Sequence, residues 1–389
     1  MERQFLVSDS GALWTMAGMH TRSILETYRL PLRAPLRTRA LVLGLLLSVQ
    51  AMPALAQDDG PDLKAARRLI EREKYEQAED ALEKVVADHP AAGAAWYLLG
   101  AARHGSKDYG GAILANERAA TFPSMRASAL YNRACAKALS GQAAAAKDSL
   151  EEAVQAGFLD WDLIASDPDL ASIRADLVLP VSRDFEELRG RNGVVVPYLV
   201  QLPGDFDPQR PTPALVTFAP GGHGPLAASW SIEHFWGDAA SEQGWILVHL
   251  VAPEKGWFTH PSHHALEDLL KKIQKDYEIA GGKFHLFGMC AGARPALTYA
   301  GMSRRYFEAI HLASADAWSR WDDSDLKDFR RMPVHQFVGS EDGLARSEME
   351  RVGVLFEKYG VQHSSTVVPD AGPLLEGLSG SAILAQIHA

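Results

Sequence analysis

Cysteine is nearly absent from this chain: Cys135 and Cys290 are the only two among 389 residues. So few cysteines exclude a disulfide-built scaffold. Because the two fall in regions of different sequence pattern, we expect no disulfide between them even in an oxidising compartment. Basic residues are fewer than acidic ones, with 39 Lys and Arg against 49 Asp and Glu. An acidic chain has no electrostatic reason to bind nucleic acid or anionic lipid.

A long apolar run is missing too. The run Ala40–Val49 is too short for a comfortable membrane span, and it lies between three arginines and a small-residue cleavage signal (Arg33, Arg37 and Arg39; Pro53 and Ala54-Leu55-Ala56). This order predicts that residues 1–56 are a bacterial-type signal peptide with a long basic segment, cleaved before Gln57, and a periplasmic or secreted protein. An uncleaved anchor is the alternative, and Met16 or Met19 is an alternative start. Removing the leader shifts the net charge from −10 to about −13.

Residues 62–155 repeat with a period of 34 residues. Matching positions recur in three units: Tyr75, Ala78, Leu82, Val85; Tyr109, Ala112, Asn116, Ala119; Ala143, Ala146, Leu150, Ala153. The spacing resembles tetratricopeptide repeats, which are helix–turn–helix pairs. We therefore expect helical repeats over 57–175, with Leu163–Arg174 as a C-terminal cap. The resemblance implies a protein partner, or packing against the next domain. An alanine-rich bundle without true repeats is the alternative.

The pattern changes after a linker at 176–194. From 195 to 389 short β-rich runs alternate with helical stretches such as Ala265–Tyr277, which predicts an α/β domain with a doubly wound, mostly parallel sheet. The predicted strands are Val194–Leu202, Leu215–Phe218, Ile246–Val251, Phe284–Phe287, Ala309–Ala313, Val334–Val338 and Thr366–Val368. Ligands of such sheets bind at the carboxyl ends of the strands.

One of these ends carries the stretch Gly288-Met289-Cys290-Ala291-Gly292. A strand before it and a helical pattern after it give the context of the G-x-S-x-G nucleophile elbow, with cysteine in the serine position. The glycines let the backbones crowd together, and the N-terminus of the following helix favours an anion, so Cys290 is expected to be a nucleophile. A buried structural cysteine on a glycine-rich turn is the alternative.

Residues 277–292 resemble the central segment of exported esterases of the α/β-hydrolase superfamily, with feruloyl-esterase, polyhydroxybutyrate-depolymerase-like and phospholipase/carboxylesterase groups among them. The cysteine is similar to that of dienelactone-hydrolase-like proteins. The resemblance covers roughly 195–389. It implies an α/β-hydrolase fold and a small-molecule ester or thioester substrate, with no cofactor.

The resemblance also implies positions for the rest of the site. The oxyanion loop of the family follows the third strand, and here Leu215–Phe218 leads into Pro220-Gly221-Gly222-His223, where the family usually has His-Gly-Gly. Backbone N–H groups near Gly221, Gly222 and Ala291 would then hold the oxyanion. The acid follows a later strand, which places it at Asp342, with Glu341 as the alternative.

The histidine of the expected triad is missing. The stretch Thr366–Leu375 fits the family pattern after the last strand, but Pro373 occupies the place of the histidine and cannot accept a proton. Loss of a triad member costs orders of magnitude in rate. A cysteine nucleophile loses less of its rate than a serine does, because a fraction of its thiol is already ionised to thiolate without a base. His223 is the candidate replacement base, ahead of His260, His263, His264, His363 and His388.

Two further groups of residues stand near the expected pocket. His260, His263 and His264 have no carboxylate or cysteine at ligand spacing, so they do not indicate a metal site. Six aromatic residues are candidates to line an apolar cleft, although some of them must be core: Trp230, Trp236, Trp257, Phe258, Trp318 and Trp321.

Two functions of different classes follow from this pattern. The first is an exported esterase-like hydrolase that cleaves an ester or thioester through Cys290, Asp342 and His223. The second is a catalytically degenerate hydrolase that acts as a periplasmic binding or scaffold protein through its repeats, as two departures from the triad suggest.

Overall fold

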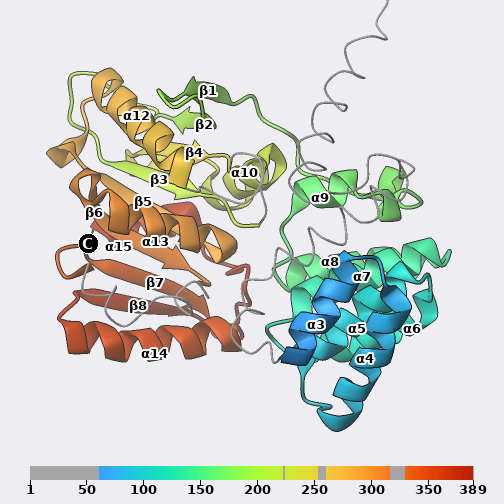
Figure 1. Cartoon of the computed structure of the whole chain (residues 1–389). Helices are drawn as coiled ribbons and strands as arrows, with labels where there is room; N and C mark the ends of the chain where they lie inside the picture. The colour runs from blue at the N-terminus through green and yellow to red at the C-terminus, as the bar shows by residue number, and fades with distance from the viewer. Residues whose placement is uncertain (1–60, 222–223, 253–259, 316–328, 389) are drawn as a thin grey trace, which may run out of the picture.

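The computed structural model describes residues 61–221, 224–252, 260–315 and 329–388, in a helical region followed by an α/β domain (Figure 1). The predicted signal peptide lies outside the described residues. Among the helices that are described, none combines the length and the apolar character that crossing a bilayer requires.

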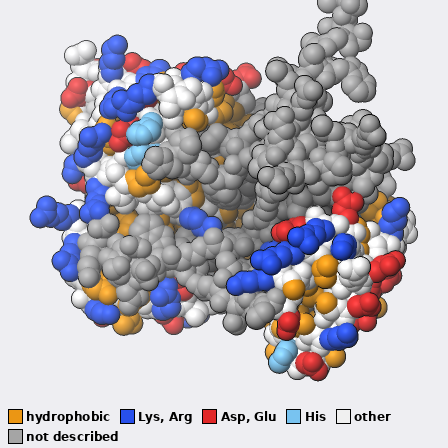
Figure 2. All heavy atoms as spheres, viewed as in Figure 1, with side chains coloured by type: hydrophobic (Ala, Val, Ile, Leu, Met, Phe, Trp, Pro, Cys, Tyr) orange, Lys and Arg blue, Asp and Glu red, His pale blue; other side chains and the backbone are white. Residues whose placement is uncertain are grey.

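Six helices form the helical region, and each packs against the next one in the chain. They are α3 (Pro61–Glu71), α4 (Tyr75–Asp88), α5 (Gly93–Gly105), α6 (Tyr109–Ala119), α7 (Arg126–Leu139) and α8 (Ala143–Gln155). On the face seen in Figure 2, Lys and Arg side chains gather over α3, at the edge nearest the α/β domain. That these helices are tetratricopeptide repeats stays a prediction.

The helices α5 and α6 approach each other closely at Asn116, the one polar residue among the matching repeat positions that are otherwise apolar or tyrosine. Asn116 of α6 is fully buried, and its side-chain amide donates to the Ala112 carbonyl at 2.9 Å. A Cβ on Gly100 of α5 would lie 2.6 Å from the Asn116 amide nitrogen. Glycine at 100 therefore leaves the room that a larger, polar residue at 116 occupies between the two helices.

The α/β domain contains one eight-stranded sheet in the order β1-β2-β4-β3-β5-β6-β7-β8. β2 pairs antiparallel with both of its neighbours, β1 and β4, and all the other pairs are parallel. The central strands are almost wholly buried because helices cover both faces, which is why they read as continuous apolar runs. The strands are β1 (Glu186–Arg189), β2 (Val195–Gln201), β3 (Ala214–Phe218), β4 (Ile246–Leu250), β5 (Phe284–Met289), β6 (Phe307–Ala313), β7 (Val334–Gly339) and β8 (His363–Val368).

Two apolar layers flank this sheet (Figure 1). One face packs against α12 (His260–Asp276), α13 (Ala293–Met302) and α14 (Gly343–Tyr359). The other face packs against α10 (Pro225–Ser231), α11 (Ala239–Gln243) and α15 (Gly380–His388). The second layer continues without a break into α7, α8 and α9 (Trp161–Ser166), so the helical region and the α/β domain share one apolar core.

The predicted α/β domain with its mostly parallel sheet is confirmed. The predicted linker at 176–194 is wrong in its second half, because β1 lies inside it and pairs with β2. This strand was missed because Glu186–Arg189 is mostly exposed and polar at the edge of the sheet, so no apolar run marks it.

Candidate functional site

Cys290 stands at the turn between β5 and α13. Its φ of +47° lies in the left-handed region, which costs a residue with a side chain roughly 1–2 kcal/mol. A Cβ on Gly288 would lie 2.5 Å from the Gly292 carbonyl oxygen, and a Cβ on Gly292 would lie 2.5 Å from the carbonyl oxygens of Phe218 and Ala219. The turn is therefore so tight, and packs so closely against the end of β3, that side chains do not fit at either flanking position.

Gly221, in the loop after β3, lies near the Cys290 turn. It has a φ of +85° and lines one cavity together with Cys290 and Ala291. The other predicted residues of this loop, Gly222 and His223, lie outside the described residues. Of the predicted oxyanion donors, the structure thus places Gly221 and Ala291 beside the Cys290 turn.

Asp342 follows β7 and lines the cavity that contains Cys290. Its carboxylate is the N-cap of α14 and accepts a hydrogen bond from the Ala345 N–H at 3.1 Å. Burial raises the pKa of Asp342 above its ordinary value, against the lowering effect of the Ala345 amide and the Ser314 hydroxyl. Within the described residues no histidine bonds to this carboxylate. Glu341, the alternative acid, lines the same cavity.

Pro373 lies where the sequence pattern placed it, at the Cys290 side chain. The Cys290 thiol, which is half-buried, donates to the Pro373 carbonyl oxygen at 3.8 Å. The group that contacts the thiol from this loop is therefore a backbone acceptor. A carbonyl oxygen can hold the thiol proton in place but cannot take it away.

The described histidines lie away from this cavity. His263 is buried on α12 against the Ser303 hydroxyl at 3.2 Å, and His264 beside it is exposed. His363 is on β8, where its Nδ1 lies 3.2 Å from the Val361 carbonyl. His260 begins α12 and His388 ends α15. Among the described residues that line the cavity there is no histidine.

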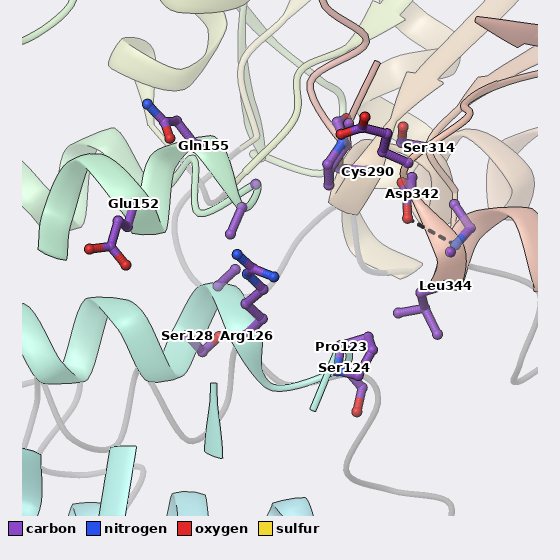
Figure 3. A pocket seen from close by; sticks show the side chains of 18 of the residues that line it. Pro123, Ser124, Arg126, Ser128, Glu152, Gln155, Cys290, Ser314, Asp342 and Leu344 are labelled. Atoms are coloured by element: carbon purple, nitrogen blue, oxygen red, sulfur yellow. Dashed lines mark hydrogen bonds between the residues drawn. The ribbon is translucent and has the colours of Figure 1, made fainter. Parts of the chain in front are cut away.

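The cavity has a volume of about 740 Å³ and lies between the helical region and the α/β domain. The wall opposite Cys290 comes from the start of α7 and the end of α8, and the Arg126 side chain reaches into the space between them and the Cys290 turn (Figure 3). The sequence missed this wall, because nothing in a helical repeat shows which surface will face a distant strand end.

Among the described residues, the lining combines charged, small and aliphatic side chains and contains no aromatic one. Trp230 and Trp236 are buried in the shared core and do not line the cavity, since their rings pack with other aromatic side chains there. Trp257, Phe258, Trp318 and Trp321 lie outside the described residues. The charged residues of the lining are one arginine and five acids: Arg126, Glu152, Glu341, Asp342, Asp370 and Glu376.

A second group of functional side chains, which the sequence did not indicate, is buried in the helical region. Potential ligand atoms of Cys135, Asp167 and Asp169 all lie within 4.8 Å of one another. They are already engaged: the Tyr131 hydroxyl donates to Asp167 at 2.5 Å, and His104 Nε2 pairs with Asp169 at 2.9 Å. These two contacts connect the helical region to the chain after α9, and we call the group of Tyr131, His104, Asp167 and Asp169 the polar clasp.

Comparison with known proteins found no matching family model and no matching curated protein. Solved structures do resemble part of the chain. A thermostable esterase is 15% identical with a TM-score of 0.42, and the match covers 53% of this chain but only 60% of the esterase, less than two thirds of its length. S-formylglutathione hydrolase from Agrobacterium tumefaciens is 12% identical over 55% of this chain and 97% of that one, with a TM-score of 0.41. Est1E from Butyrivibrio proteoclasticus is 11% identical over 53% of this chain and 100% of that one, with a TM-score of 0.40.

Proposed function

We propose that this chain is an esterase-like acyl hydrolase whose nucleophile is the Cys290 thiol. One observation carries the proposal: Cys290, on a strained turn at the carboxyl end of β5, lines the same cavity as Gly221, Ala291 and Asp342. Nucleophile, backbone donors and carboxylate thus meet at the edge of a parallel sheet where ligands bind.

The proposed reaction has two halves. The Cys290 sulfur attacks the carbonyl carbon of an ester or thioester, and the carbonyl electron pair moves onto oxygen, where the N–H groups of Gly221 and Ala291 stabilise the negative charge. The electron pair then returns, the alcohol or thiol leaves with a proton, and the acyl group stays on sulfur as a thioester. Water cleaves this thioester, which releases the acid and restores the thiol.

His223 is the proposed base of this cycle, with Asp342 as the carboxylate that orients it. The proposal rests on the place of His223 in the sequence between Gly221 and Gly224. The six charged side chains of the cavity lining favour a small, polar acyl group over a long-chain lipid.

We also propose that the protein is exported, because residues 1–56 have the order of a signal peptide. The helical region is the proposed contact surface for a protein partner. Cell fractionation with N-terminal sequencing tests export: a periplasmic or secreted form that begins at Gln57 supports it, and a cytosolic full-length chain contradicts it.

A second candidate is a binding protein on a degenerate hydrolase frame. The contact between the Cys290 thiol and the Pro373 carbonyl favours it, because it leaves the nucleophile beside an acceptor that cannot remove its proton. The N-cap role of Asp342 favours it as well, since helix capping alone explains that carboxylate.

Turnover of p-nitrophenyl acetate by the purified protein, measured beside Cys290→Ala and Cys290→Ser, separates the two candidates. Turnover that vanishes in Cys290→Ala supports the cysteine hydrolase, and loss in His223→Ala then tests the base. If wild type and Cys290→Ala are equally inactive while a thiol probe still labels Cys290, the binding protein is favoured. A decayed triad predicts that Pro373→His, in a Cys290→Ser background, raises activity by orders of magnitude.

A further inference from the structure

The segment Gly157–Asp162, which leaves the last repeat helix, touches both loops that surround Cys290. A Cβ on Gly157 would lie 3.5 Å from Pro373, so the segment runs beside the loop that contacts the nucleophile. Two residues on, the Leu159 carbonyl oxygen packs so closely on Gly221 that a side chain there would overlap it. The helical region therefore reaches past the cavity wall and contacts the predicted oxyanion loop directly.

Asp162 makes the most specific of these contacts. Its carboxylate accepts a hydrogen bond from the Leu226 N–H at 3.1 Å, at the first turn of α10. The same carboxylate packs against Gly224, where a Cβ would overlap it. Gly224 has a φ of +119°, which only glycine adopts readily. One side chain thus fixes the point at which the loop after β3 becomes a helix.

The chain that follows Asp162 is also held by the helical region. Asp167 accepts the Tyr131 hydroxyl at 2.5 Å, and Asp169 pairs with His104 at 2.9 Å. All of these side chains are buried or nearly so. Buried polar groups that contact one another favour one geometry, because separating them leaves polar atoms without partners. Asp162 is therefore presented to the α/β domain from a rigid support.

We infer that Asp162 is a positioning residue for acyl transfer at Cys290, supplied by the helical region: together with Leu159 on Gly221, it holds Gly224 and so fixes the two described ends of the loop after β3. The inference rests on the proposed function, and it gives the helical region a part in the reaction itself. Oxyanion donors act only when they are aimed within a few tenths of an ångström, and the loss of one costs about 10²–10³ in rate. A loop released at one end loses that aim.

Two reactions of the same sulfur test the inference. Acylation of Cys290 by p-nitrophenyl acetate passes through an oxyanion, whereas alkylation by iodoacetamide displaces iodide at a saturated carbon and needs no oxyanion hole. We expect Asp162→Ala to slow acylation about tenfold or more and to leave alkylation within about twofold. Asp162→Asn should recover much of the acylation rate, because its amide oxygen can still accept from Leu226 N–H. Asp176→Ala, at an exposed aspartate 14 residues further along the chain, is the matched control.

Gly224→Ala disturbs the same contact, because the added methyl group would overlap the Asp162 carboxylate. It should also slow acylation and leave alkylation unchanged, so the test does not depend on how well Asp162→Ala folds. Folding is checked for each variant by its thermal midpoint. Equal acylation by folded Asp162→Ala and wild type overturns the inference while leaving the proposed function intact. A wild type that is alkylated but never acylated overturns the proposed function instead. Parallel loss of acylation and alkylation in both variants assigns Asp162 a structural role only and overturns the inference.

Discussion

Gly292→Ala is the sharpest test of the geometry around Cys290. The added methyl group would stand 2.5 Å from the backbone carbonyl oxygens of Phe218 and Ala219. Neither oxygen can move freely, because Phe218 is the last β3 residue paired with β5, opposite Gly288. The methyl group must therefore push α13 and the Cys290 turn away from the sheet, and overpacking of this kind costs about 1–3 kcal/mol.

Urea unfolding followed by tryptophan fluorescence measures the cost. Gly343→Ala is the matched control, because a Cβ at this first residue of α14 meets nothing within 4 Å. Alanine there should be neutral or stabilise by up to about 1 kcal/mol, since alanine loses less backbone entropy in a helix. Alkylation of Cys290 reports on the turn itself, and its rate should change in Gly292→Ala alone. Equal unfolding midpoints for the two variants would refute the close packing described here.

Three other predictions concern the buried polar groups. Burial and Arg183 lower the pKa of His249 to about 3. Between pH 6.5 and about pH 3 the unfolded chain binds this proton and the folded chain does not, so the free energy of unfolding decreases as the pH is lowered. The decrease is about 2 kcal/mol at pH 5. His249→Gln should therefore reduce the difference in unfolding free energy between pH 7.5 and pH 5 by about that amount, and an unchanged difference contradicts the assignment. Tyr131→Phe removes the donor to the buried Asp167 carboxylate and should cost about 1.5–3 kcal/mol in urea unfolding, whereas a cost below 0.5 kcal/mol would mean that the clasp is not formed. One thiol, Cys290, should react with a thiol probe in the native protein and two in urea, because Cys135 is 3% exposed and burial raises the pKa of its thiol.

The sequence predicted the parts of the fold that rest on local pattern. The strands from β3 to β7 are apolar runs because both faces of the sheet are covered, and such runs are visible without a structure. The turn at Cys290 was visible for a similar reason, since the glycines on both sides are required by backbone contacts a few residues away. The edge strand β1, which buries little, gave no comparable pattern.

The parts that the sequence did not predict are contacts between distant segments. Nothing near Asp162 in the chain indicates that it bonds to Leu226, 64 residues away. The sequence shows a proline at 373, where a histidine was expected. The contact of the Pro373 carbonyl oxygen with the Cys290 sulfur, however, depends on how the loop after β8 folds back. The polar wall from α7 and α8 depends on how two separately predicted regions pack together.

Under the proposed function, cysteine at 290 and proline at 373, where the sequence resemblance led us to expect serine and histidine, are chemically linked. A serine at position 290 would face the Pro373 carbonyl as a neutral hydroxyl and would depend wholly on a base to become nucleophilic. A free thiol is a few per cent ionised near pH 7 without help and is strongly nucleophilic in that fraction, so losing the base costs it far less. The carbonyl at 3.8 Å opposes ionisation, whereas the N-terminal end of α13 favours it. Under the proposed function, cysteine at 290 therefore keeps part of the reactivity that proline at 373 would remove, and acylation depends on the proposed base His223 and on the proposed donors at Gly221 and Ala291, whose loop Asp162 is inferred to position.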